Sequence, residues 1–132
     1  MSPEEKDKKI SDETKADLTY KEDLSIAVMN LIAVEEHLAF TAMKTNNDMY
    51  LDVLKEVRKL RVELQKKLIG SPNGELWCIS KHLLSATMRL MESSTKYVGE
   101  NKNDEAMKLE KSAFDLYSLF WFLNKTDSKE EK

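Results

Sequence analysis

The sequence has few of the residues that interrupt regular structure: three glycines and two prolines among 132 residues. Folds built from many short strands need these residues in their turns, so their scarcity favours a few long helices. The single cysteine, Cys78, excludes an internal disulfide and a zinc site made of repeated Cys-x-x-Cys pairs. A lone cysteine is typical of a reducing, intracellular compartment.

The sequence also lacks an excess of positive charge, because its formal net charge is −3. This charge provides no general attraction to nucleic acid or to an anionic membrane, and the basic stretch 55–67 is interleaved with acids, as on a solvated helix face. The charged N-terminus contains no secretory h-region, and Glu35, Glu36 and His37 interrupt the most apolar run. The sequence therefore predicts a cytoplasmic protein with no membrane or nucleic-acid partner and no cofactor.

Apolar residues instead recur with the 3.6-residue period of a helix. The period predicts four helices, at about 20–44, 48–69, 73–98 and 104–124. Thr19 and Glu22 have the spacing of a capping box at the start of the first helix, while Gly70 and Gly99 mark the ends of the second and third.

The connections between these helices are short, which favours antiparallel neighbours. We therefore predict an all-α fold, an antiparallel up-down-up-down four-helix bundle formed by residues 19–125. The charged ends, residues 1–18 and 126–132, cannot bury enough apolar area to offset the entropy of ordering, so they are predicted to be flexible tails.

Each predicted helix carries an apolar stripe that we expect to face the core. The stripes consist of Leu24, Val28, Leu31, Leu38 and Ala42; Tyr50, Val53, Leu54, Val57, Leu60, Leu64 and Leu68; Ile79, Leu83, Ala86, Leu90 and Tyr97; and Ala106, Leu109, Ala113, Leu116, Phe120 and Leu123. Glu35 falls within the first stripe and Arg61 within the second. An unpaired charge in a core is costly, and the turn near Asn46 brings the two residues level, so we predict a buried Glu35–Arg61 ion pair.

This pair has two interpretations. In the first, it fixes the register of the helices and has no chemical role. In the second, it belongs to a polar pocket where Glu35 acts as a base or contacts a ligand, with His82 and Arg89 pointing inward from the third helix. The structural interpretation is favoured, and the sequence leaves the second open.

Metal chemistry is suggested by two groups of residues. Glu35, Glu36 and His37 resemble a di-iron motif, but that motif needs a glutamate three residues before the histidine, and Val34 stands there. Glu75, Cys78 and His82 have spacings of three and four, so they lie on one side of a helix and could hold a soft metal with help from another helix. A Cys–His nucleophile is disfavoured because no oxyanion arrangement is recognisable. We favour ordinary packing roles for Cys78 and His82, and predict no bound metal.

Large apolar side chains also remain outside the main stripes. They are Met29, Phe40, Trp77, Met88, Met91, Phe114 and Trp121. Soluble monomers rarely expose a contiguous apolar patch, and methionine and aromatic residues are common in interfaces, so these residues predict a homodimer.

The leading hypothesis is thus a non-enzymatic helical-bundle module that self-associates. Binding of another protein is a further role that this hypothesis allows. The alternative is a small-molecule- or metal-binding bundle, either a binding protein or an enzyme, with a polar site around Glu35, Arg61, Cys78 and His82. Neither hypothesis names a substrate or a partner.

Overall fold

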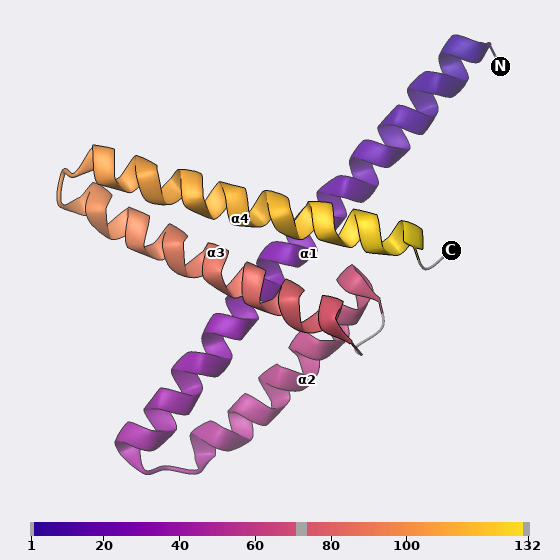
Figure 1. Cartoon of the computed structure of the whole chain (residues 1–132). Helices are drawn as coiled ribbons and strands as arrows, with labels where there is room; N and C mark the ends of the chain where they lie inside the picture. The colour runs from indigo at the N-terminus through magenta and orange to yellow at the C-terminus, as the bar shows by residue number, and fades with distance from the viewer. Residues whose placement is uncertain (1, 71–73, 131–132) are drawn as a thin grey trace.

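The computed structural model describes residues 2–70 and 74–130, and within them the side chains of Ser2, 19–70 and 74–124. It contains four helices: α1 (Pro3–Thr45), α2 (Met49–Ile69), α3 (Glu75–Gly99) and α4 (Asn103–Glu130) (Figure 1). The residues that the structure describes include no strand, so the predicted all-α class is confirmed.

The helix boundaries differ from the prediction mainly at the two ends of the chain. α1 begins at Pro3 and not near Thr19, and α4 extends to Glu130 instead of ending near residue 124. The capping box is therefore wrong, because Thr19 lies inside α1. Glutamate and lysine are good helix formers, and they extend a helix that is already nucleated without burying apolar area. The flexibility of the charged ends stays a prediction, and the expected helix start at 73 lies outside the described residues.

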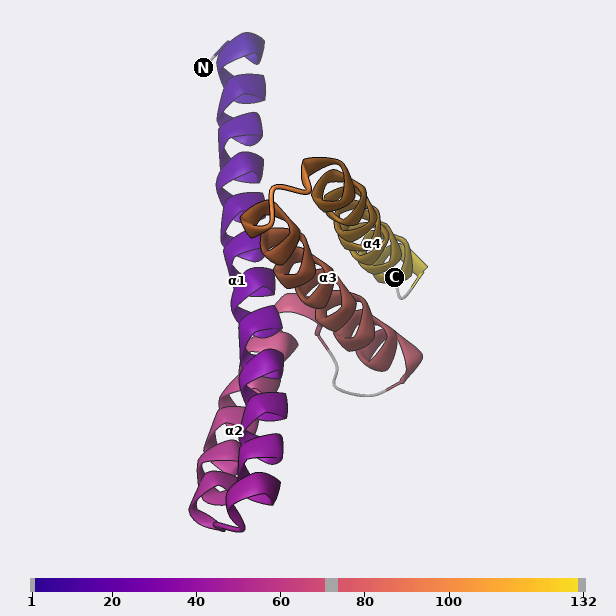
Figure 2. The same ribbon diagram turned by 90° about the vertical axis from the view of Figure 1, so that its left-hand side faces the viewer.

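The helices are arranged as two antiparallel hairpins, α1–α2 and α3–α4, joined mainly by packing of α3 on α1. The second hairpin crosses α1 obliquely, and the far end of α1–α2 extends beyond the crossing (Figures 1 and 2). A helical bundle is thus confirmed, but a regular up-down-up-down arrangement of four aligned helices is not. Each hairpin is a layer of two helices, so it is covered by further helices only where the other hairpin crosses it.

The turns within the hairpins depend on asparagine in the left-handed region of the backbone. Asn46 has φ of 52° after α1, and Asn101 has φ of 62° after α3. Asparagine tolerates this region better than most residues. In the first turn the side-chain oxygen of Asn47 also accepts a hydrogen bond from the backbone N–H of Met49, at 3.0 Å. These turns reverse the chain and set the register of each hairpin.

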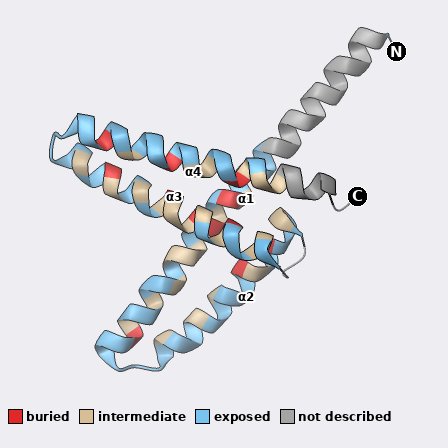
Figure 3. Ribbon diagram, in the orientation of Figure 1, coloured by how far each residue is buried: buried red, intermediate tan, exposed pale blue. Residues whose placement is uncertain are grey.

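The apolar core lies where the hairpins cross. Val28 and Met29 of α1 pack there against Leu84 of α3 and Phe120 of α4. Buried positions of the ribbon lie near the crossing (Figure 3). Among residues that flank the predicted stripes, Met29 is only 3% exposed. Its predicted place in an interface is therefore wrong. The crossing of α3 and α4 covers the side of α1 that carries Met29, which a bundle of four aligned helices would leave open.

The buried side of α3 is not the one that its apolar stripe predicts. Leu84 is buried, but the other buried residues of α3 are small and hydroxylic: Ser80, Thr87 and Ser94. Ser94 donates to the carbonyl of Ala106 at 3.1 Å, and Asn124 donates to Ser80 Oγ at 3.1 Å. Small side chains let α3 and α4 approach closely, and these hydrogen bonds satisfy the buried hydroxyls. The predicted apolar stripe of α3 therefore lies outside the buried side of the helix, and Ile79 in that stripe is 42% exposed.

Candidate functional site

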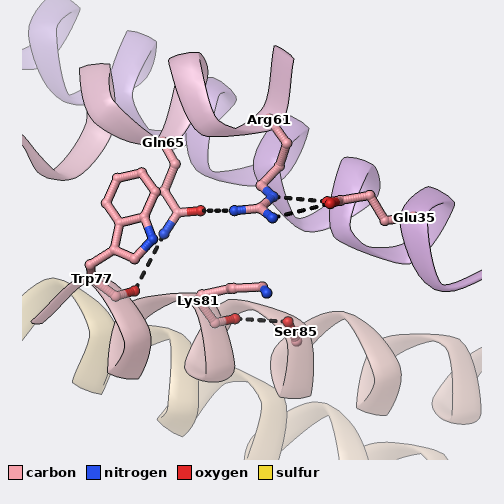
Figure 4. Close-up of polar contacts among 6 residues, drawn as sticks. All are labelled: Glu35, Arg61, Gln65, Trp77, Lys81 and Ser85. Carbon is pink, nitrogen blue, oxygen red and sulfur yellow. Dashed lines mark hydrogen bonds and ion pairs between the residues drawn. The ribbon is translucent and has the colours of Figure 1, made fainter. Parts of the chain in front are cut away.

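The polar residues predicted for the core of the first hairpin meet between α1 and α2. Arg61 Nε lies 2.8 Å from Glu35 Oε2, and Arg61 Nη2 lies 3.1 Å from Glu35 Oε1, so the ion pair is bidentate (Figure 4). The side chain of Arg61 is 3% exposed and that of Glu35 is 13% exposed. Two parallel N–H···O bonds are the strongest geometry for this kind of pair. The structure thus brings together the two residues that the antiparallel register predicts.

The guanidinium group also connects the pair to a third helix. Arg61 Nη1 donates to Gln65 Oε1 at 3.0 Å, and Gln65 Nε2 donates to the backbone carbonyl of Trp77 on α3 at 3.3 Å (Figure 4). Gln65 is fully buried. It follows Arg61 by four residues and therefore lies on the same ridge of α2, which is the sequence signal that would have identified it. The network thus connects α1 to α2 through the ion pair and α2 to α3 through Gln65.

The buried polar groups of the network satisfy one another. Within the described part of the chain, every buried side-chain nitrogen and oxygen has a hydrogen-bond partner. A binding or catalytic site in a core usually keeps at least one donor, acceptor or charge directed into a cavity. The arrangement therefore has the features of a structural network.

The residues predicted to complete a polar site lie elsewhere. Cys78 and His82 are exposed, and Arg89 is an exposed residue that pairs with Glu36 at 3.0 Å and with Glu92 at 3.3 Å. The inward direction predicted for His82 and Arg89 is thus wrong, because the buried side of α3 is rotated toward Ser80 and Leu84.

The possible metal site is not assembled either. Glu75 is exposed at the start of α3, as Cys78 is one turn later. Across the described residues, no three side chains of histidine, cysteine, aspartate or glutamate lie close enough together to hold a metal ion. The spacing along one helix brings three possible ligands to one side, but no other helix covers that side with a fourth.

The predicted interface residues separate into three groups. Met29 is in the core; Met88 and Trp121 are half-buried against it, and Trp121 meets the ring of Phe120 edge-on at 4.9 Å. Trp77 is half-buried beside the polar network. The exposed members are Phe40, Met91 and Phe114. Met91 and Phe114 line one cleft together with Met29 and Met88, whereas Phe40 does not, so the seven residues as a whole do not define one exposed surface.

Two other apolar surfaces are more continuous. The outer face of the α3–α4 hairpin, on the side away from α1, consists of Ile79, Ala86, Leu90, Tyr97, Leu116, Leu119 and Leu123, while Leu83 beside it packs against the core. At 3.6 residues per turn, these positions lie roughly opposite Leu84 and Met88 on α3 and opposite Tyr117 and Trp121 on α4, which face the core. All of them are half-buried or exposed, and Leu119 is 53% exposed.

A second surface covers the side of the first hairpin that faces away from α3. This outer face of the α1–α2 hairpin consists of Val34, Leu38, Met49, Val53 and Leu60. Leu60 is 56% exposed, although its stripe predicts a core position. It is uncovered because α3 and α4 cross on the opposite side of the hairpin, where Ile32 and Ile69 pack against the core.

α1 also has a property that the sequence analysis does not predict. Between Thr19 and Thr45 it is long and apolar enough to cross a membrane, judged by length and composition, and 22% of that apolar stretch is buried inside the fold. The same stretch carries Glu35 and Glu36, which are paired with Arg61 of α2 and Arg89 of α3. Insertion of α1 alone into a bilayer would break both pairs and expose charge to hydrocarbon.

Comparison of the chain with protein-family models, with curated proteins and with solved structures gives no match. The functional argument therefore depends on the surfaces and contacts described above.

Proposed function

We propose that this chain is a non-enzymatic helical module that self-associates as a symmetric homodimer through the outer face of the α3–α4 hairpin. The observation that supports the proposal is the row of apolar side chains on that face, in particular Leu119 and Ile79. Soluble monomers rarely leave a large contiguous apolar surface uncovered. Leucine and isoleucine at helical spacing on both helices give the face the pattern of a core cut in half.

A second copy of the same hairpin is a suitable partner for this face. Two antiparallel hairpins packed face to face form a four-helix bundle, the arrangement in which a two-helix layer buries both of its sides. A twofold axis allows the same patch to serve both subunits, so a single exposed face is sufficient. The outer face of the α1–α2 hairpin is then free to contact another protein, in a cytoplasmic setting.

The alternative function, a site around Glu35, Arg61, Cys78 and His82, has less support. Glu35 and Arg61 satisfy each other and Gln65, while Cys78 and His82 are exposed on a different helix. We propose that the ion pair serves to hold α1, α2 and α3 in register.

The proposal predicts the mass of the protein in solution. At micromolar concentration, sedimentation equilibrium should give twice the 15.3 kDa of one chain. Replacing Leu119 by glutamate should shift the mass to that of the monomer, because the dimer would bury two like charges in an apolar interface. Circular dichroism of the variant should remain helical, since Leu119 lies outside the core.

Two matched variants identify the surface. Met43→Glu changes an exposed apolar residue outside both outer faces and should leave the dimer intact. Leu60→Glu places the same charge on the outer face of the α1–α2 hairpin and should also leave it intact. A monomeric wild-type protein would contradict self-association, whereas dissociation by Leu60→Glu but not by Leu119→Glu would move the interface to the first hairpin.

A further inference from the structure

A cleft separate from both outer faces opens on the inner side of the α3–α4 hairpin, where α1 crosses it. Its volume is about 330 Å³, within the roughly 300–1,000 Å³ that is typical of small-molecule sites. The lining residues are Glu22, Ile26, Met29 and Asn30 of α1; Thr87, Met88 and Met91 of α3; and Glu110, Ala113, Phe114 and Tyr117 of α4.

The walls of this cleft are apolar and adaptable. Three of the chain's seven methionines line it, and their flexible thioether side chains fit apolar bodies of different shapes. Ile26, Met91 and Phe114 are large apolar side chains that remain exposed there. An apolar group that enters the cleft would therefore remove their surfaces from water.

The polar groups of the cleft are suited to a ligand that donates hydrogen bonds. Asn30 Nδ2 is already used as a donor to the carbonyl of Ile26, and Thr87 Oγ1 donates to the carbonyl of Leu83, so their oxygens remain able to accept. Glu22 of α1 and Glu110 of α4 add two carboxylates, and among the described residues neither has an ion-pair partner. The lining includes no lysine, arginine or histidine.

We propose that this cleft binds an amphiphilic amine, with its apolar body among Met29, Met88 and Met91 and its ammonium group between Glu22 and Glu110. The two carboxylates select the charge of the ligand, because a carboxylate-bearing amphiphile of equal length would meet two like charges. The site is independent of the proposed dimer, which uses the opposite side of α3 and α4.

Octylamine, octanol and octanoate are suitable probes, because they share one chain and differ in head group. The full-length protein, labelled with ¹³C at its methionine methyls, is titrated with each probe at low ionic strength. Octylamine should saturate and shift the methyl signals of Met29, Met88 and Met91, leaving Met43, Met49 and Met107 in place. Octanol should bind more weakly, and octanoate should be the weakest of the three.

Charge-neutral variants test the carboxylates. Glu22→Gln combined with Glu110→Gln should weaken octylamine binding about three- to tenfold and leave octanol unchanged, since each exposed ion pair contributes little. The matched control is Glu56→Gln combined with Glu105→Gln, which removes the same charge from residues paired with Lys59 and Lys108 away from the cleft. Its affinity for octylamine should equal that of the wild type.

A second variant blocks the cleft without changing its charge. Asn30→Trp places a large ring at an exposed lining position and should abolish the octylamine-induced shifts while circular dichroism stays unchanged. Equal affinity for octanoate and octylamine, or shifts confined to Met43, Met49 and Met107, would overturn the proposal. So would shifts of the cleft methionines on dilution of the monomeric Leu119→Glu variant, because they would show that a second copy occupies the cleft.

Discussion

Replacing Arg61 by methionine should lower the free energy of unfolding by about 3–5 kcal/mol, the range for a buried ion pair that loses one partner. The loss of stability arises from the polar groups that would remain without a partner. Glu35 would keep its charge without the two N–H groups that now bind it, and Gln65 Oε1 would lose its donor. Methionine fills much of the volume of arginine, so the change is mainly electrostatic. Urea denaturation followed by circular dichroism at a fixed protein concentration measures the effect.

The controls separate a structural network from a functional site. Glu35→Leu combined with Arg61→Met should recover most of the lost stability, because an apolar pair no longer contains an isolated charge. Arg89→Met removes an arginine that pairs with Glu36 at the exposed surface, and it should cost no more than about 1 kcal/mol. A higher melting temperature for Arg61→Met would contradict the structural interpretation, because relief of strain is the behaviour of a functional pocket.

The ion pair was predictable because its evidence is local. Glu35 and Arg61 each fall inside an apolar stripe, and a short turn makes the hairpin antiparallel, so the register follows from counting residues. Gln65 was not predicted, because an amide at the edge of a stripe is ordinary in a sequence. Only the position of α3, which places the carbonyl of Trp77 beside it, gives Gln65 its role.

The crossing of the two hairpins could not be predicted from the stripes. An apolar stripe indicates that a helix covers something, but it does not indicate at which angle the covering element runs. The buried hydroxyls of α3 carry the missing information. Ser80 and Ser94 appear polar in the sequence, yet they lie at the contact with α4, where small size matters more than hydropathy. The apolar stripe through Ile79 and Leu90 consequently stays half-buried or exposed.

This distribution of side chains has a consequence for stability. Among the side chains that the structure describes, few apolar ones are buried, and four of them, Val28, Met29, Leu84 and Phe120, form the cluster at the crossing. The hairpins therefore depend on one another at a small number of contacts, and truncation of the largest of these side chains should have an effect out of proportion to one residue.

Phe120→Ala is accordingly expected to reduce the free energy of unfolding by about 3–5 kcal/mol. Phe120 is fully buried, and its ring lies 6.3 Å from that of Tyr117 and 4.9 Å from that of Trp121. A cavity there would also loosen Tyr117, whose hydroxyl is 2.6 Å from Ser25 Oγ on α1. The substitution thus acts on the joint between α4 and α1 as well as on the core.

Phe114→Ala is the matched control, because it removes the same ring from an exposed position of α4. It should change stability by no more than about 0.5 kcal/mol, as is usual for surface positions. Urea denaturation measures both variants, and in a Trp77→Phe background the fluorescence of Trp121 alone reports its environment. Because Phe120 holds α4 on α1, its loss should make the Trp121 signal change at lower urea than the helical signal, whereas a single coincident transition would show that the hairpins do not separate at this joint.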